Sequence, residues 1–334
     1  MAVTIKDIAR LANVSHTTVS RALNGSPLIK EETRRRIMEI ADQMSYTPNY
    51  NAKSLVLQKS HTIGVFFTSI ASGTSSSFLA DTMKGVSGVI DVNYNLFVRG
   101  IDDYTDFSSI HGKRFDGIVL MSQSDSDDAF IYHARSKGIP LVVLNREVKA
   151  EGICNILSDD RDGAYLAGRH LIDSGHERIG LIEGRRSFKS AAERRDGLLR
   201  AMIESHLPIN GECIVPGDYT TQGGYEAMRA LLDLDTPPTA VFCANDDTAI
   251  GAMNAVFERG LRVPDDISIV GFDDIGFSSY TNPALTTVKR PIERISRRGA
   301  QTLVEWLRTG IAPPQETIRL HTELIVRKSV EERR

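Results

Sequence analysis

The stretch VTIKDIARLANVSHTTVSRALNG, residues 3–25, contains two short helical patterns separated by a tight break. Thr4 can cap the first helix, because it offers a hydroxyl group and an acidic residue stands three positions later. Apolar residues then recur at helical spacing, namely Ile5, Ile8, Ala9 and Ala12. Ser15 can cap a second helix, which ends at the stop signal Asn24-Gly25. Two short helices with so tight a turn predict a helix-turn-helix.

The second helical pattern has an apolar side and a polar side. Its expected apolar anchors are Val14, Val19, Ala22 and Leu23. The polar residues left to face outward near its N-terminal half, which a recognition helix places against base edges, are His16, Thr17, Ser20 and Arg21. Arg21 can donate two hydrogen bonds to guanine, and Thr17 can offer a methyl group to thymine. The alternative is a small helical bundle that does not bind DNA.

The N-terminal segment differs in charge from the rest of the chain. Residues 1–59 hold nine Lys and Arg against five Asp and Glu, a net charge of +4, whereas the whole chain carries −3. A basic module on an acidic body favours nucleic acid as the partner of the N-terminal end. A charged surface helix is the alternative, because the arginines 34–36 fall in a third expected helix, 30–44, beside Glu31 and Glu32.

The composition is ordinary for a globular protein. The 334 residues are 41% hydrophobic and 25% charged, and their number suggests about two domains. Cys154, Cys213 and Cys243 form no CxxC pair, so we expect neither a disulfide framework nor a structural zinc site. The N-terminus lacks the apolar core of a signal peptide, and no window approaches the ~18 apolar residues of a membrane span. We therefore expect a cytoplasmic protein with no membrane partner.

From residue 62 the pattern changes to strands alternating with helices. The expected strands are 62–68, 95–99, 117–121, 141–144, 178–183, 240–243 and 267–271. The expected helices include 78–92, 161–174, 191–205, 223–234 and 247–259. Such alternation predicts parallel sheets covered on both faces. By pattern alone, this part is either one large α/β enzyme or two lobes.

The N-terminal stretch, followed by YTPNYNAKSL at 46–55, resembles the LacI/GalR family of bacterial transcription regulators. The resemblance implies a hinge helix after the helix-turn-helix, which enters the minor groove of double-stranded palindromic operator DNA. Leu55 matches the leucine that wedges the central base step open, and Lys53 stands where many members have Arg. A plain linker is the alternative for 50–57. The DNA-binding residues expected on these grounds are Thr4, Ser15, His16, Thr17, Ser20, Arg21, Asn24, Asn49, Ala52, Lys53 and Leu55.

Four stretches of the remaining chain also resemble the core of that family, at 158–182, 238–253, 260–274 and 282–291. The resemblance implies an α/β core like that of periplasmic binding proteins, with two doubly wound parallel-sheet lobes, three crossovers and a ligand cleft. The expected organisation is an all-α helix-turn-helix domain at 1–47, a hinge helix and linker at 48–60, and a ligand-binding and dimerisation core at 61–334. Within the core, the resemblance implies that lobe 1 takes about 61–158 and 289–320, and that lobe 2 takes about 159–288 and the final strand near 321–330.

The loops after the strands should line the cleft, because ligands of open α/β sheets bind beyond the carboxyl ends of the strands. The resemblance implies ligand contacts for Arg194, in preference to its neighbour Arg195, and for Tyr219 and Arg290, with Phe78 as a wall. Position after strands adds Asn145, Arg146, Asn245 and Asp273, whereas Asp246 is expected to be structural, capping the following helix. An interlobe salt bridge or helix cap is the alternative for Asp273, and lobe packing the alternative for Tyr219.

Three expected cleft arginines, Arg146, Arg194 and Arg290, favour a negatively charged effector such as a sugar acid or sugar phosphate, over a neutral sugar. Pairing of these arginines with Asp273 or Asp246 would weaken that argument. In addition, SIASGTSSSF at 69–78 departs from the commoner family pattern, which affects the expected contacts of the first lobe.

The sequence carries no nucleotide-binding, zinc-protease or hydrolase motif and no ligand-spaced histidine cluster, so we expect neither an enzyme nor a cofactor or metal. The favoured function is repression of carbohydrate-metabolism genes, controlled by a small sugar-like effector. A homodimer or a tetramer is expected. One alternative is a sugar-binding or sugar-processing protein with an incidental N-terminal module. Another is control by a protein corepressor that docks on the first lobe.

Overall fold

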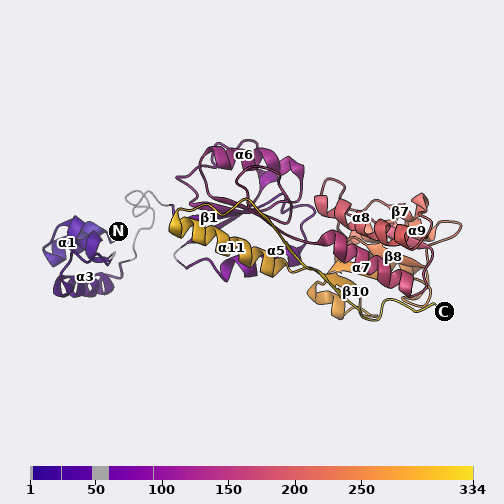
Figure 1. Ribbon diagram of the computed structural model, residues 1–334. Coiled ribbons are helices and arrows are strands. Elements are labelled where there is room, and N and C mark those ends of the chain that lie inside the picture. Colours follow the sequence, from indigo (N-terminus) through magenta and orange to yellow (C-terminus); the bar gives the residue numbers. More distant parts are fainter. Residues whose placement is uncertain (1–2, 24, 47–59, 93, 334) are drawn as a thin grey trace. The chain divides into compact units, whose positions relative to one another are not determined.

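The computed structural model describes residues 3–23, 25–46, 60–92 and 94–333. The chain divides into two compact units, Met1–Lys59 and Ser60–Arg334, and each is considered by itself (Figure 1). In the described residues no helix is both long enough and apolar enough to span a bilayer.

The N-terminal unit is a bundle of three helices, α1 (Ile5–Ala12), α2 (His16–Leu23) and α3 (Glu31–Gln43). Each helix contributes one fully buried side chain to a common core, which contains Ile8, Val19 and Ile37. The expected helix-turn-helix is confirmed, with a C-cap after α1 at Asn13, whose φ of 51° lies in the left-handed region. The backbone amide of Thr18 donates to the Ser15 hydroxyl oxygen at 3.1 Å, so Ser15 caps α2.

The core contains two six-stranded sheets. The first has the order β11-β5-β4-β3-β1-β2 and is parallel throughout. The second has the order β12-β10-β9-β8-β6-β7 and is parallel except for β12, which pairs antiparallel with β10. The strands are β1 (Thr62–Phe67), β2 (Asn95–Gly100), β3 (Gly117–Met121), β4 (Leu141–Leu144), β5 (Asn155–Ser158), β6 (Ile179–Ile182), β7 (Ile214–Val215), β8 (Ala240–Cys243), β9 (Ser268–Asp273), β10 (Thr286–Lys289), β11 (Thr317–Leu320) and β12 (Glu323–Ile325).

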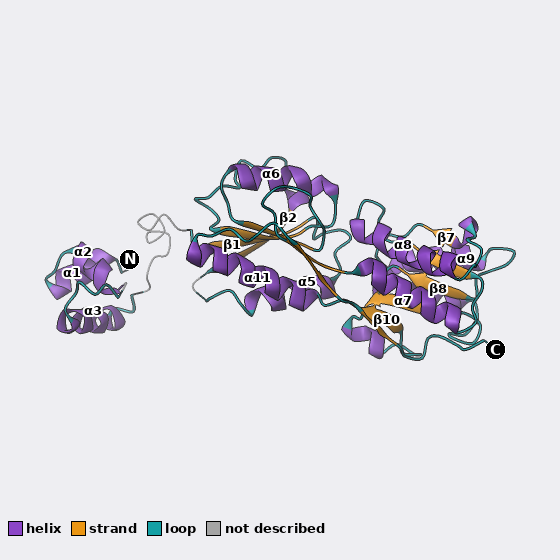
Figure 2. Ribbon diagram, in the orientation of Figure 1, coloured by secondary structure: helices purple, strands orange, loops and turns teal. Residues whose placement is uncertain are grey.

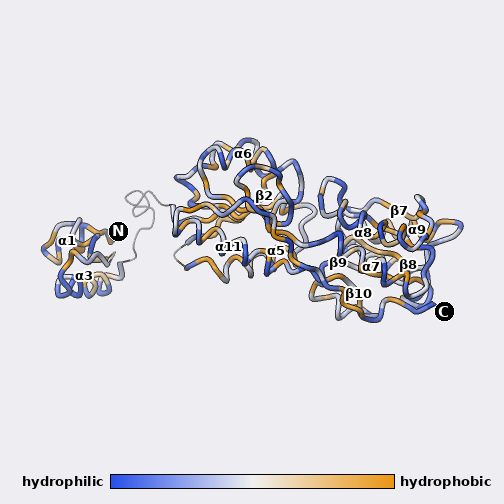
Figure 3. Tube along the Cα trace, in the orientation of Figure 1, coloured by the Kyte–Doolittle hydropathy of each residue, from blue (hydrophilic) through white to orange (hydrophobic). Residues whose placement is uncertain are grey.

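Helices cover both faces of each sheet, so each sheet with its helices forms one lobe (Figure 2). In the first lobe, α5 (Ser76–Ser87) and α11 (Ile292–Thr309) share one hydrophobic cluster, and α6 (Asp128–Ser136) belongs to the cluster on the other face. In the second lobe, α7 (Asp160–Asp173) and α8 (Lys189–Glu204) share one cluster, while α9 (Thr221–Leu232) and α10 (Asp246–Glu258) share the other. Hydrophobic residues gather along the strands between these layers (Figure 3).

The chain passes between the lobes three times, after β5, after β10 and after β11. The expected fold class, a helix-turn-helix unit and a two-lobed α/β core, is therefore confirmed. The alternating pattern did not identify five strands, namely β5, β7, β10, β11 and β12, although β12 lies within the final strand that the family resemblance places near 321–330. Each has four residues or fewer, and β10 places polar Thr286 and Thr287 in a buried position, so none shows a long apolar run.

Candidate functional site

A pocket of about 330 Å³ lies between the two lobes. We call it the interlobe pocket, and it is lined by Gly73, Ser75, Phe78, Gln123, Asn145, Ser190, Arg194, Tyr219, Asn245, Asp273 and Arg290. That volume includes space open to solvent. Most lining residues stand directly after a strand or in the first turns of a helix, because parallel strands bring their carboxyl ends to one edge of a sheet.

Arg194 lies on α8 and is almost completely buried. Its Nε and Nη2 donate to Oδ2 of Asp160, each at 3.0 Å, and Nη2 also donates to Oδ1 of Asp273 at 3.3 Å. Its Nη1 donates to the carbonyl oxygen of Ala244, and the guanidinium carbon lies 3.9 Å from the centre of the Phe272 ring. These contacts hold the guanidinium group in one orientation against the pocket.

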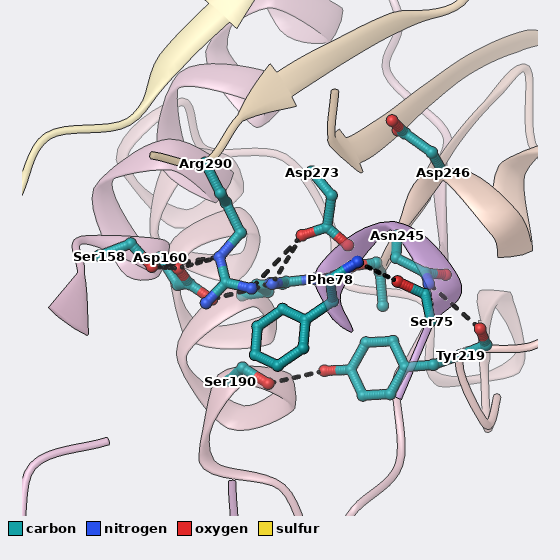
Figure 4. Close-up of polar contacts among 12 residues, drawn as sticks. Ser75, Phe78, Ser158, Asp160, Ser190, Tyr219, Asn245, Asp246, Asp273 and Arg290 are labelled. Atoms are coloured by element: carbon teal, nitrogen blue, oxygen red, sulfur yellow. Dashed lines mark hydrogen bonds and ion pairs between the residues drawn. The ribbon is translucent and has the colours of Figure 1, made fainter. Parts of the chain in front are cut away.

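Arg290 follows β10 and connects the two lobes (Figure 4). Its Nε donates to Oδ1 of Asp160 at 3.0 Å and to the Ser158 hydroxyl oxygen at 3.1 Å. Its Nη2 donates to Oδ1 of Asn145 at 2.6 Å, and Nη1 lies 3.5 Å from Oδ1 of Asp273. Asp160 thus holds both pocket arginines, although it does not itself line the pocket.

The two arginines and two carboxylates balance in charge. Burial alone would raise the pKa of Asp160, but Arg290 and Arg194 more than offset it and hold this pKa below its ordinary value. Burial raises the pKa of Asp273, and the same arginines offset this only in part. Oδ2 of Asp273 has no hydrogen-bond partner among the described residues, so it is available to accept one from a ligand hydroxyl group.

Aromatic side chains form the apolar part of the pocket. Tyr219 is buried, its hydroxyl oxygen lies 3.0 Å from that of Ser190, and its ring stacks on Phe188 at 5.9 Å. Phe78, on α5, adds a second ring from the first lobe. Nδ2 of Asn245 donates to the carbonyl oxygen of Tyr219 at 3.1 Å and fixes the loop before α9. Sugars present apolar C–H faces that such rings can cover.

Three pocket residues have a positive φ, which is uncommon for residues other than glycine. The values are 72° at Asn145, 71° at Tyr219 and 107° at Asp273. Backbone strain of this kind persists where the surrounding structure holds it in place, and it concentrates at ligand sites. All three residues lie at or beyond the carboxyl end of a strand and aim polar or aromatic groups at the same pocket.

Seven of the eight expected ligand residues line the interlobe pocket, and Arg146 does not. The expectation that Arg146 points into the cleft is wrong. Its Nη1 contacts Asp125 at 2.9 Å, its Nη2 contacts Asp128 at 2.6 Å, and its Nε donates to the Ser122 hydroxyl oxygen at 2.9 Å. Two nearby carboxylates attract this arginine within the first lobe, and the argument for an anionic effector loses one of its three arginines.

Asp246 is structural, as expected, but it does not cap α10. Asn245 is the cap, because its Oδ1 accepts from the backbone amide of Thr248 at 3.0 Å. Asp246 instead accepts hydrogen bonds from the Ile275 amide and from the hydroxyl groups of Ser278 and Thr287. Burial raises the pKa of Asp246 to about 7.

Four pocket residues were missed from the sequence, namely Gly73, Ser75, Gln123 and Ser190. Ser75 carried a detectable signal, since its hydroxyl oxygen accepts from the Phe78 amide at 3.1 Å and caps α5. Both Gly73 and Ser75 belong to the stretch 69–78, which departs from the family pattern. Among the described residues, no cluster of three or more His, Cys, Asp or Glu side chains suits a metal ion.

The described part of the expected DNA-binding surface lies on the N-terminal unit. Thr4, Ser15, His16, Thr17 and Arg21 are exposed, and Ser20 is half-buried. The Arg21 side chain has no hydrogen-bond or ion-pair partner among the described residues, so its guanidinium group is free to bind another molecule. The expected contacts Asn24, Asn49, Ala52, Lys53 and Leu55 lie outside the described residues.

Models of known protein families match both the N-terminal unit and the core. Residues 4–49 match the lacI family of bacterial regulatory proteins, and residues 169–330 match the periplasmic binding protein-like domain. The probable HTH-type transcriptional repressor ExuR of Bacillus subtilis is 59% identical over 331 residues, which are 98% of each chain. The HTH-type transcriptional repressor PurR of Pasteurella multocida is 34% identical, with 99% of each chain covered.

Solved structures agree with this assignment. The lac repressor dimer bound to operator and the anti-inducer ONPF superposes with a TM-score of 0.86 at 28% identity, over 99% of this chain and 100% of that one. A LacI family transcriptional regulator from Enterococcus faecium with bound ribose gives a TM-score of 0.73 at 27% identity, over 82% of this chain and 100% of that one.

Proposed function

The chain belongs to the lacI family of bacterial regulatory proteins, and we propose that it represses carbohydrate-metabolism genes under the control of a sugar-like effector held in the interlobe pocket. Members of this family are DNA-binding transcriptional regulators and not enzymes. The observation that carries the proposal is the pair of buried guanidinium groups of Arg194 and Arg290, which are held in fixed orientations beside Asp273 and two aromatic rings.

The pocket chemistry suits a polyhydroxylated ring. The rings of Tyr219 and Phe78 can cover its C–H faces, and Oδ2 of Asp273 can accept from one of its hydroxyl groups. The Ser75 and Ser190 hydroxyl groups and the Gln123 amide add further polar atoms. A ligand that contacts both lobes favours one arrangement of the lobes over another, and it controls DNA binding only through that difference in affinity.

The charge of the effector is a separate question, because Asp160 and Asp273 already pair with the two pocket arginines. A matched panel tests it, in which the ring is constant and the charge changes: glucose, glucuronate and glucose 6-phosphate, beside galactose, galacturonate and galactose 6-phosphate. We expect at least one sugar to raise the Tm of the protein, because binding to the folded state alone stabilises it. No shift with any of the six, at millimolar concentrations, would contradict a sugar-like effector.

For the DNA-binding unit, we propose that α2 enters the major groove; the expected hinge segment, 48–59, lies outside the described residues. The free guanidinium group of Arg21 supports the assignment of α2. A homodimer is the proposed functional assembly, since two units can bind the two halves of a palindromic operator. The structural relative with operator is also a dimer. Sedimentation equilibrium distinguishes a dimer from a tetramer by mass.

A protein corepressor is a second candidate for control, and one feature of the first lobe favours it. An open groove is lined by Arg294, Arg297, Arg298, Gln301, Ile318 and Leu320, from α11 and the edge strand β11. Its three arginines make it basic, and Ile318 and Leu320 make it partly apolar, so it suits the surface of an acidic protein. Replacement of Arg294 and Arg298 by Glu would abolish a response to such a partner and leave the response to a sugar unchanged.

A further inference from the structure

A set of contacts joins the two lobes beside the interlobe pocket. Nζ of Lys189, the first residue of α8, lies 2.8 Å from Oδ2 of Asp125 in the first lobe. The backbone amide of Lys189 donates to the carbonyl oxygen of Gln123 at 2.9 Å. Nη1 of Arg185 donates to the Ser72 hydroxyl oxygen at 3.3 Å. Gln123 and Ser190 line the pocket, so these contacts border it, but none lies in a crossover segment.

Asp125 is held in place for this contact from its own lobe. Its Oδ1 accepts from Nη1 of Arg146 at 2.9 Å, and its Oδ2 faces Lys189 of the other lobe. Arg146 is buried and anchored by Asp128 and Ser122, so its position does not depend on the second lobe. The side-chain entropy cost of an ion pair is reduced when one partner is already fixed. This arrangement also gives Arg146 a role outside the pocket.

We propose that Asp125 and Lys189 form a latch that stabilises the closed arrangement of the two lobes and thereby sets the affinity of the interlobe pocket for its effector. Neither side chain lines the pocket, so the latch acts without touching the ligand. The inference rests on the proposed function in one respect, since it assumes that the effector binds between the lobes. The structural part, that these two residues control lobe closure, does not depend on any ligand.

The expected size of the effect follows from the exposure of the pair. The side chains of Asp125 and Lys189 are 60% and 53% exposed, and pairs of this kind contribute little individually. The apparent dissociation constant equals the intrinsic one divided by the fraction of closed protein. Loss of the latch should therefore weaken effector binding about two- to fivefold. Salt screens exposed pairs, so raising the salt concentration should weaken closure in the wild type.

Lobe closure can be measured without a ligand by energy transfer between dyes on the two lobes. The three native cysteines are buried, so Lys137→Cys on the first lobe and Asp235→Cys on the second provide selective labelling sites. Labelled chains are mixed with excess unlabelled protein to exclude transfer between subunits. The test variants are Asp125→Asn, Lys189→Gln and the double variant, with Lys189→Arg as the conservative change. The matched control is Lys84→Gln, which breaks an exposed ion pair to Asp81 within α5.

Energy transfer should fall in both single variants, and the double variant should equal either single variant, because one interaction is lost in each case. Lys189→Arg and Lys84→Gln should match the wild type. Transfer in Lys189→Gln that equals the wild type from 50 mM to 500 mM salt would overturn the proposal. If closure changes as expected but none of the six sugars binds, the control of lobe closure by Asp125 and Lys189 is supported and the proposed sugar-like effector is contradicted. If a sugar binds to wild type and to Lys189→Gln with equal affinity, sugar binding is supported and the proposed effect of the latch on affinity is contradicted.

Discussion

Asp160 is the residue on which the charge balance of the interlobe pocket depends. Each of its oxygens accepts hydrogen bonds from a different arginine, and it is 4% exposed. The family resemblance identified both arginines but not their shared carboxylate. Asp160 stands at the start of α7 beside Asp159, the N-cap of that helix, so helix capping was a sufficient explanation for acidic residues at this position.

Replacement of Asp160 by Asn should change the charge preference of the pocket. The variant removes one negative charge and leaves Arg194 and Arg290 in excess over Asp273. We expect the ratio of glucuronate affinity to glucose affinity, or the galacturonate to galactose ratio, to rise about tenfold, since charge-assisted hydrogen bonds contribute ~1.5–3 kcal/mol. Titration calorimetry measures both constants. Asp196→Asn, which removes an exposed carboxylate that pairs with Arg161, is the control.

A merely structural role for Asp160 gives a different result. The variant would then lower the Tm and weaken both sugars equally, because a distorted pocket has no reason to favour the anion. An unchanged affinity ratio would contradict the electrostatic role assigned to this carboxylate.

Arg21 on α2 should contribute selectivity to DNA binding. Arg21→Ala removes a guanidinium group that has no partner among the described residues, and loss of a bidentate base contact costs about 1–3 kcal/mol. We expect the affinity ratio between a selected operator and a scrambled site to fall roughly tenfold. Fluorescence anisotropy of labelled duplexes measures it. Arg35→Ala, which removes an exposed arginine of α3 that pairs with Glu39, should weaken both duplexes alike, and equal ratios for Arg21→Ala and wild type would refute the assignment.

At the scale of elements, the sequence predicted those whose pattern is local. The helices α1, α2 and α3 were located within a residue or so, because caps and apolar spacing agree. The strands β3, β4 and β8 carry apolar runs and were located correctly. In contrast, β11 and β12 lie at sheet edges and are partly exposed, and only pairing with distant strands defines them. Such pairing leaves no local pattern.

A histidine in the turn between α7 and β6 should make the free energy of unfolding of the core depend on pH. His176 is buried in this turn, with Nδ1 2.9 Å from the Thr239 hydroxyl oxygen, and burial lowers its pKa from 6.5 to about 4. Between these values the unfolded chain takes up a proton that the folded chain does not, so the free energy of unfolding falls as pH falls from 6.5 to 4. Above pH 6.5 this residue contributes no pH dependence.

His176→Gln should remove this contribution to the change in the free energy of unfolding with pH. The free energy of unfolding of the variant minus that of the wild type should increase by roughly 2 kcal/mol from pH 8 to pH 4.5, whatever the stability of the variant at pH 8. Urea unfolding at both pH values measures the difference. His206→Gln, at an exposed position, is the control. A constant difference between wild type and His176→Gln at the two pH values would contradict the assignment.

At the scale of the whole molecule, family resemblance located the pocket but not its internal pairing. Seven expected residues from both lobes meet there, although they are spread from Phe78 to Arg290 along the chain. The position of Arg146 could not be deduced, because its partners Asp125 and Asp128 lie in a short 3-10 turn and at the start of α6, whose positions depend on the folded first lobe. The latch to Lys189 is likewise a property of the assembled core.

The central claim is that one polar ligand in the interlobe pocket controls DNA binding, and the most direct test is operator affinity with and without the best-binding sugar of the panel. In the wild type, saturating sugar should change operator affinity at least tenfold, in either direction. Arg194→Ala should bind the operator like the ligand-free wild type and show no change with sugar, because its guanidinium group is lost from the pocket. Arg195→Ala, which alters an exposed neighbour paired with Glu183, should switch normally. A normal switch in Arg194→Ala would contradict the account.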